Sequence, residues 1–300
     1  MTFLACTYAD NQPQARLHFS RSEYDELLRA REIDFSQFVI ENKYQILLDN
    51  YAEFEEELLR FSLNWVIRTP DPWDTLRDAN PVFDRRVLNF LSSARMYLDQ
   101  IPGDLETASR QPKLAKDKFQ KSTSAQYDSS LAFRVCEALR NYTQHKNLPV
   151  HGVSHGARRQ QHEDIVTNYS GLTLDISKLE IDGKFKSTVL DELRANNDNH
   201  DLKSYLRQYM HSLGLIHLEL RNTLNADSEW AISLIRQVIA KVKALPSVDP
   251  QSYVFLAIGA DDGTFEIESR INTERFDRRK LLEACTRVAP RLTQVHLSSE

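Results

Sequence analysis

The chain has 300 residues, of which 41% are hydrophobic and 27% charged, and this composition indicates a globular protein with enough material for one large domain or two ordinary ones. It contains eight glycines, whereas an average chain of this length has about twenty, and the shortage disfavours an α/β enzyme built on Gly-rich phosphate-binding turns. The net charge of -5 by itself indicates no particular partner. The three cysteines are widely spaced and form neither a disulfide framework nor a Cys-X-X-Cys metal or redox motif.

The first half of the chain has the periodicity of amphipathic helices. Apolar residues recur at threes and fours, which predicts a short helix near 20–31, a long helix over 34–67, a helix over 81–101 and a strong helix over 127–146. Pro70 and Pro72 interrupt the pattern after the long helix, and Pro102-Gly103 is a stop signal for the next one. These four segments predict an N-terminal helical bundle.

The second half changes character, because seven of the eight glycines follow residue 150. Alternating apolar residues predict a strand over 172–176, and a Gly-rich turn between 253–258 and 264–268 predicts a β-hairpin. Two amphipathic helices are expected over 202–220 and 230–242. We therefore predict a mostly α protein with two domains, a helical bundle over 1–160 and a smaller α+β region of unknown role over 161–300.

Residues 110–160 form a basic segment on an otherwise acidic chain, with ten Lys and Arg side chains against three acids. Such a segment favours binding of a polyanion, although a solvated Lys-rich surface has the same composition. Within and beside it, we expect RNA phosphates to be contacted by Lys113, Lys116, Lys118, Lys121, Lys146, Arg158 and Arg159.

The sequence Arg140-Asn141-Tyr142-Thr143-Gln144-His145 lies at the end of the helix expected over 127–146. An arginine matches phosphate oxygens, and a histidine exchanges protons near neutral pH, so Arg140 and His145 are candidate catalytic residues for RNA cleavage. Asn141 is a candidate for orienting the phosphate or the ribose. On an ideal helix Arg140 and His145 point about 140° apart, so they meet around one phosphate only if the helix frays or if two copies of it come together.

This hexapeptide resembles the Arg-polar-X-X-X-His signature of the HEPN superfamily, whose helical-bundle domains occur in prokaryotic toxins, antiphage systems and CRISPR ribonucleases. The resemblance covers roughly 20–150 and implies a bundle of HEPN type and a metal-independent endoribonuclease that needs no cofactor. It also implies a composite site in a homodimer, catalytic roles for Arg140, Asn141 and His145, and a toxin or antiphage role with a possible antitoxin or defence-system partner.

Two further patterns offer other chemistries. Four histidines fall within eighteen residues, namely His145, His151, His155 and His162, and His151 and His155 have the spacing of a helical metal site, although nearby Pro149, Gly152 and Gly156 favour a loop. The stretch 152–156 also matches the Gly-X-Ser-X-Gly pattern of serine hydrolases, without the strand–turn–helix context that this chemistry requires.

The alternative to the ribonuclease is a non-catalytic RNA-binding or protein-interaction module built on a dimeric helical bundle. The basic segment fits this reading equally well, because phosphate binding requires no histidine. The chain also shows neither a secretory signal pattern nor an apolar window of membrane-spanning length, so we expect a cytoplasmic protein without membrane contact.

Overall fold

A computed structural model of the chain describes residues 1–9, 12–68, 70–159, 166–196, 200–246, 248–249, 251–260 and 264–285. The described part is mostly helical and divides into two compact units. Unit 1 comprises Met1–Asn42, Ile101–Lys118 and Leu220–Cys285, and the described part of unit 2 lies within Lys43–Gln100 and Phe119–Glu219. The long helices contribute one portion to each unit.

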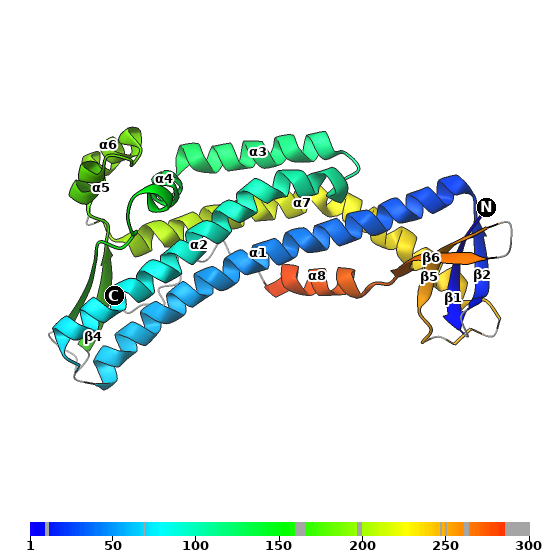
Figure 1. The fold of residues 1–300 in the computed structure, drawn as a ribbon, viewed down its shortest axis with the longest axis horizontal. Coiled ribbons are helices and arrows are strands. Elements are labelled where there is room, and N and C mark those ends of the chain that lie inside the picture. Colours follow the sequence, from blue (N-terminus) through cyan, green and yellow to red (C-terminus); the bar gives the residue numbers. More distant parts are fainter. Residues whose placement is uncertain are drawn as a thin grey trace. The chain divides into compact units, whose positions relative to one another are not determined.

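Unit 1 contains an antiparallel sheet with the strand order β2-β1-β5-β6 (Figure 1). Its strands are β1 (Thr2–Ala9), β2 (Gln12–Phe19), β5 (Val254–Gly259) and β6 (Phe265–Ile271). Ala5 pairs with Leu256 in the centre of the sheet, and both are fully buried. Their face packs against helices α1 (Arg21–Ile67) and α7 (Leu202–Lys243), so the main core of the unit lies between sheet and helices.

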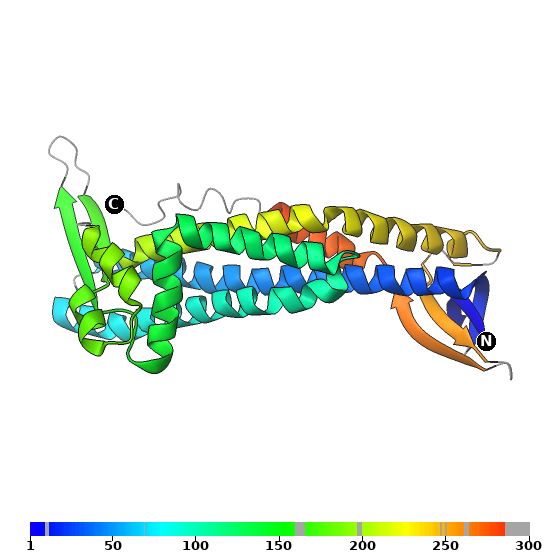
Figure 2. The ribbon, with the colours of Figure 1, turned by 90° about the horizontal axis from the view of Figure 1, so that it is seen from above.

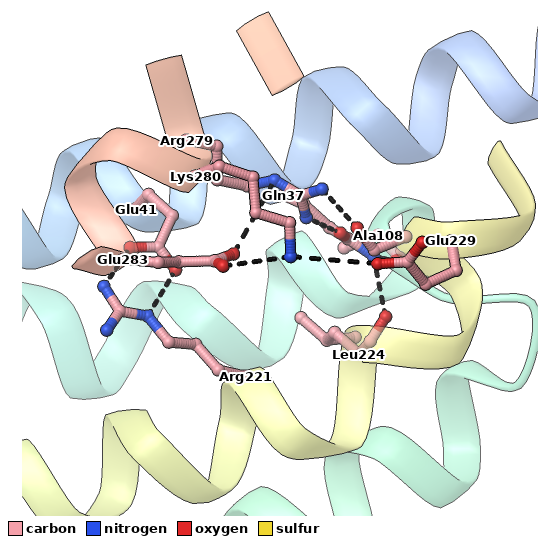
Figure 3. Close-up of polar contacts among 10 residues, drawn as sticks. Gln37, Glu41, Ala108, Arg221, Leu224, Glu229, Arg279, Lys280 and Glu283 are labelled. Atoms are coloured by element: carbon pink, nitrogen blue, oxygen red, sulfur yellow. Dashed lines mark hydrogen bonds and ion pairs between the residues drawn. The ribbon is translucent and has the colours of Figure 1, made fainter. Parts of the chain in front are cut away.

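Charged and amide side chains connect the helices of unit 1 in its interior (Figure 3). Arg279 of α8 (Glu274–Cys285) is buried and donates hydrogen bonds to Gln37 Oε1 of α1 and Ser228 Oγ of α7. Gln37 in turn donates to the carbonyl of Ala108, at the end of α2 (Pro72–Ala108), at 3.0 Å. Because a buried charge is costly unless it is paired, these bonds fix α8 in one position on α1 and α7.

Unit 2 holds the remaining portions of α1, α2 and α7, most of α3 (Pro112–Ser129), and helices α4 (Leu131–His145), α5 (Ile176–Asp182) and α6 (Ser187–Ala195). An antiparallel pair, β3 (Gly152–Arg159) and β4 (Val166–Thr173), stands beside α5 and α6 (Figure 2). At Gly156 a Cβ atom would lie 2.1 Å from the half-exposed ring of Tyr169 on β4, so a side chain there would displace this ring. Arg207 and Glu55 form a bidentate ion pair that joins α7 to α1, with distances of 2.7 and 2.8 Å.

Several predicted helix ends are wrong, because burial overrides local stop signals. The helices expected near 20–31 and over 34–67 are one helix, α1, and those expected over 202–220 and 230–242 are one helix, α7. Helix α2 runs through Pro81 and Pro102-Gly103, since Ile101 and Leu105 are fully buried on either side of that pair. The basic connector expected over 104–125 is largely helical, because α3 begins at Pro112.

The strand predictions are confirmed only in part. The hairpin around 259–263 is confirmed by the pairing of β5 with β6. The strand expected over 172–176 is wrong after Thr173, because Asp175 caps α5 by accepting hydrogen bonds from the backbone amides of Ser177 and Lys178. Strands β1 and β2 were not expected, and β1 pairs with β5 from the far end of the chain. Consequently the boundary expected at residue 160 does not coincide with the division between the units.

Candidate active site

Helix α4 positions the motif Arg140–His145 at its C-terminal end. The hydroxyl of Ser130 caps the start of the helix by accepting a hydrogen bond from the amide of Phe133 at 3.2 Å. At the other end the amide of Lys146 donates to the carbonyl of Tyr142 at 2.9 Å, so the backbone stays helical through the whole motif. One face of α4 is buried along its length and consists of Ala132, Phe133, Val135, Cys136, Ala138, Leu139 and Tyr142.

The three candidate catalytic residues are accessible to different extents. Arg140 is half-buried, whereas Asn141 and His145 are exposed. Arg140 Nη1 donates to Asn141 Oδ1 at 3.3 Å, and Arg140 Nε is buried without a hydrogen-bond partner among the described residues. In the described structure no hydrogen bond joins His145 to either residue. The helix therefore brings Arg140 and Asn141 together and presents His145 separately, one turn further along.

Tyr142 connects the motif to helix α5. Its hydroxyl donates to Asp182 Oδ2, and Asn147 Nδ2 lies 3.5 Å from the same oxygen. The hydrogen bond from Tyr142 is the main reason why the pKa of the Asp182 carboxyl is lowered, while burial and the same bond raise the pKa of the Tyr142 phenol. Because Tyr142 stays protonated and Asp182 ionised, this contact anchors the end of α4 under neutral conditions.

His151 is held as a neutral imidazole just after the motif. Its Nδ1 accepts a hydrogen bond from the amide of Asp175 at 2.8 Å, which places the proton on Nε2, an atom that is buried without a hydrogen-bond partner in the described structure. Burial, and then the positive charge of Lys178, lower the pKa of His151 below its usual 6.5. The His151 ring also packs edge-on against the ring of Tyr142, with centroids 6.4 Å apart, so His151 supports the motif through Tyr142.

The other clustered histidines do not assemble a metal site in the described part of the chain. His155 stacks on Trp65 with ring centroids 4.4 Å apart, and its Nδ1 lies 3.5 Å from Ser170 Oγ; burial lowers its pKa. His162 lies outside the described residues. Among the residues that the structure describes, no three His, Cys, Asp or Glu side chains are grouped closely enough to hold a metal ion.

The Gly-X-Ser-X-Gly stretch lies within a strand. Ser154 is on β3, where it pairs with Gly171 of β4, and the strand continues to Arg159. A nucleophile elbow instead requires a sharp turn from a strand into a helix. The local structure therefore excludes the serine-hydrolase geometry.

The basic residues divide into paired and unpaired groups. Lys116 pairs with Glu106, and two other cations of the segment, Arg110 and Arg134, pair with Asp227 and Glu192. Among the residues predicted to contact RNA, the exposed ones are Lys113, Lys118, Lys121, Lys146 and Arg158. Arg159 ends β3, and its side chain lies outside the described part of the structure. The positive charge is thus partly neutralised within the fold, and much of the remainder lies on α3.

Sequence reasoning located the motif at a helix end but missed its supporting residues. Tyr142 lies within the motif, but its partner Asp182 follows forty positions later in another helix. Asp175, which precedes the short helix α5, has the character of an N-cap, and this signal was present in the sequence. The hydrogen bond from the Asp175 amide to His151 depends on where α5 lies in the fold, and no local sequence pattern indicates it.

Comparison with family models, with curated proteins and with solved structures finds no match to this chain. In the described residues, no helix has the combined length and apolar character of a membrane span. The motif and the residues around it are therefore the only basis for a proposal about function.

The neutral state of His151 predicts a pH-dependent stability. Since its pKa is lower in the folded than in the unfolded chain, the unfolded chain binds more protons below pH 6.5, and the free energy of unfolding falls as the solution is acidified. We expect His151→Asn, whose amide oxygen can accept the Asp175 N–H, to reduce the fall measured by urea unfolding between pH 7.5 and 5.5. One such proton contributes at most about 1.4 kcal/mol per pH unit.

Lys178→Gln is the matched comparison, because it removes the nearby positive charge and keeps the imidazole. It should reduce the pH dependence less than His151→Asn does, since burial is the larger cause of the lowered pKa. Equal pH dependence in the wild type and in His151→Asn would contradict this account.

Proposed function

We propose that the protein is a metal-independent endoribonuclease of HEPN type that cleaves single-stranded RNA or the loops of tRNA. The observation that carries the proposal is the placement of Arg140, Asn141 and an exposed His145 at the end of a continuous bundle helix. The exposed cations Lys146 and Arg158, which follow the motif along the chain, add positive charge suited to an RNA backbone. A single strand is favoured because in-line attack requires a backbone freedom that an A-form duplex restricts.

The proposed reaction is an internal transfer of the phosphodiester. The ribose 2′-oxygen forms a bond to phosphorus, and the bond from phosphorus to the 5′-oxygen breaks, which leaves a 2′,3′-cyclic phosphate and a 5′-hydroxyl. His145 either accepts the proton of the 2′-hydroxyl, while water protonates the leaving 5′-oxygen, or donates a proton to the 5′-oxygen, while water accepts the proton of the 2′-hydroxyl. Arg140 stabilises the charge on the pentavalent phosphorane, and Asn141 orients the phosphate or the ribose.

The continuity of α4 favours a site shared between two copies of the chain. Because the backbone is helical as far as His145, fraying does not bring Arg140 and His145 to one phosphate. We therefore propose a homodimer in which Arg140 of one copy lies near His145 of the other, through an interface of at least about 1,000 Å². A cytoplasmic toxin or antiphage role, restrained by an antitoxin or defence-system partner, is the biological setting consistent with this chemistry.

The first test of this proposal is cleavage of labelled total RNA in the presence of excess chelator. Arg140→Ala and His145→Ala should each lower the rate, the histidine variant by about 10²–10⁴-fold, because loss of a general acid or base has that effect. The products of the wild type should carry 2′,3′-cyclic phosphate termini. Lys184→Ala is a control that removes an exposed cation outside the motif and outside the basic segment, and it should retain the cyclising chemistry. Equal cleavage by the wild type and both motif variants would refute the ribonuclease.

The shared site predicts complementation between inactive chains. In a mixture of Arg140→Ala and His145→Ala chains, each heterodimer has one site with both substitutions and one site with neither, so part of the activity should return. The oligomeric state is measured in parallel by analytical ultracentrifugation. A monomer at micromolar concentration, with no recovery of activity on mixing, would contradict the shared site and leave a single-chain ribonuclease possible.

The second candidate function is a non-catalytic RNA-binding or protein-interaction module. It is favoured by the exposed Lys113, Lys118 and Lys121 on α3, for which the described structure shows no ion pair. Replacing all three with Gln should weaken RNA binding at low salt and flatten its dependence on salt concentration, because fewer counterions are released. If a cellular phenotype is lost in this variant and survives His145→Ala, the module is the better description.

A further inference from the structure

Unit 1 contains an open cavity of about 550 Å³ between α1 and the first turn of α8, whereas the motif on α4 belongs to unit 2. Two arginines from different helices line it, Arg31 on α1 and Arg275 on α8. Its apolar wall is formed by Leu28 and by Phe35, whose side chain is 49% exposed.

The acidic residues of this cavity are already paired with other arginines. Asp25 accepts a hydrogen bond from Arg21 at 3.0 Å, and Glu32 accepts one from Arg29 at 2.6 Å. Arg29 also donates a hydrogen bond to the backbone carbonyl of Ser109 at 2.7 Å, so its guanidinium points towards the residue that follows α2. The acids that line the cavity therefore form their ion pairs with arginines other than Arg31 and Arg275.

Arg31 and Arg275 form no ion pair within 4.0 Å among the described residues, while the carboxylates of Glu268 and of the buried Asp34 act on them at longer range. Arg31 Nε is buried without a hydrogen bond, and burial, followed by the charge of Arg275, lowers the pKa of Arg31. The Arg275 guanidinium lies over the ring of Phe35, with 5.1 Å from its central carbon to the ring centroid. The two guanidinium charges repel each other in this cavity. A bound dianion would offset that repulsion and would accept a hydrogen bond from Arg31 Nε.

We propose that this cavity binds a small molecule that carries a phosphate group on a planar or apolar body. A guanidinium matches a phosphate in a bidentate geometry, and two guanidinium groups match the double charge of a phosphate monoester better than the single charge of a carboxylate. The half-exposed ring of Phe35 and the side chain of Leu28 provide the surface against which the body of the ligand packs. The site is independent of the proposed ribonuclease, because its residues lie in unit 1 and the motif lies in unit 2.

The test is isothermal titration of the full chain with AMP, which combines a phosphate monoester with a planar base. Adenosine and inorganic phosphate are the comparison probes. We expect AMP to bind at least tenfold more tightly than adenosine, which lacks the charge, and more tightly than inorganic phosphate, which lacks the body. Arg31→Gln and Arg275→Gln should each weaken AMP binding at least tenfold, since each removes a charge-assisted hydrogen bond.

The matched control is Arg278→Gln, which removes an exposed arginine from the same helix, α8, with the same change in net charge. It should bind AMP like the wild type. Arg275→Lys keeps the positive charge but lacks the planar guanidinium, so its affinity for AMP should lie between those of the wild type and Arg275→Gln. Circular dichroism of each variant checks that it is folded. Unchanged AMP affinity in the two folded Gln variants, or an equal loss in Arg278→Gln, would overturn the proposal.

A last arm distinguishes a small phosphorylated ligand from the RNA backbone. A single-stranded RNA of twelve nucleotides should bind Arg31→Gln and the wild type equally and should not displace AMP. If RNA displaces AMP and loses affinity in Arg31→Gln, the cavity is a contact for RNA and the proposed ligand is wrong. His145→Ala should bind AMP normally, so failure of the ribonuclease and failure of this site are separate results.

Discussion

Antiparallel pairing between β1 and β5 is the contact on which unit 1 depends. It joins residues 2–6 to residues 255–259 by backbone hydrogen bonds, and it places Ala5 and Leu256 together on the buried face of the sheet. That face covers the apolar side chains of α1 and α7, which form no closed core by themselves. A short hairpin is marginal when isolated, so β1–β2 and β5–β6 each gain stability by forming one four-stranded sheet.

Buried charges supply the specificity that apolar packing alone lacks. Arg221 and Glu41 form a bidentate pair between α7 and α1 in unit 1, and Arg207 and Glu55 do the same for these two helices in unit 2. A helix face of Leu and Ile can slide by one turn with little loss of contact area, whereas a buried guanidinium is left unpaired by the same shift. Such pairs therefore fix the register of the long helices, and Arg279 fixes that of α8.

The sequence predicted the type of most elements and the place of the motif, and it failed where distant contacts decide. Helix α4 and the hairpin β5–β6 were predicted because periodicity and a Gly-rich turn are local signals. The joining of two predicted segments into α1, and the course of α2 through Pro102, depend on burial against residues far along the chain. For the same reason the spacing in the sequence suggests Arg140, Asn141 and His145 as candidates, whereas no local pattern indicates the anchoring of Tyr142 by Asp182.

The separation of β1 from β5 along the chain also affects how unit 1 forms during synthesis. A ribosome adds about 5–20 residues per second, so the strand that ends at Ala9 waits roughly 12–50 s before Val254–Gly259 is made. Throughout that time the β1–β2 hairpin has an edge without its partner, and an unpaired edge is a template for association with other chains. The nascent chain therefore carries this open strand edge until Val254–Gly259 has left the ribosome.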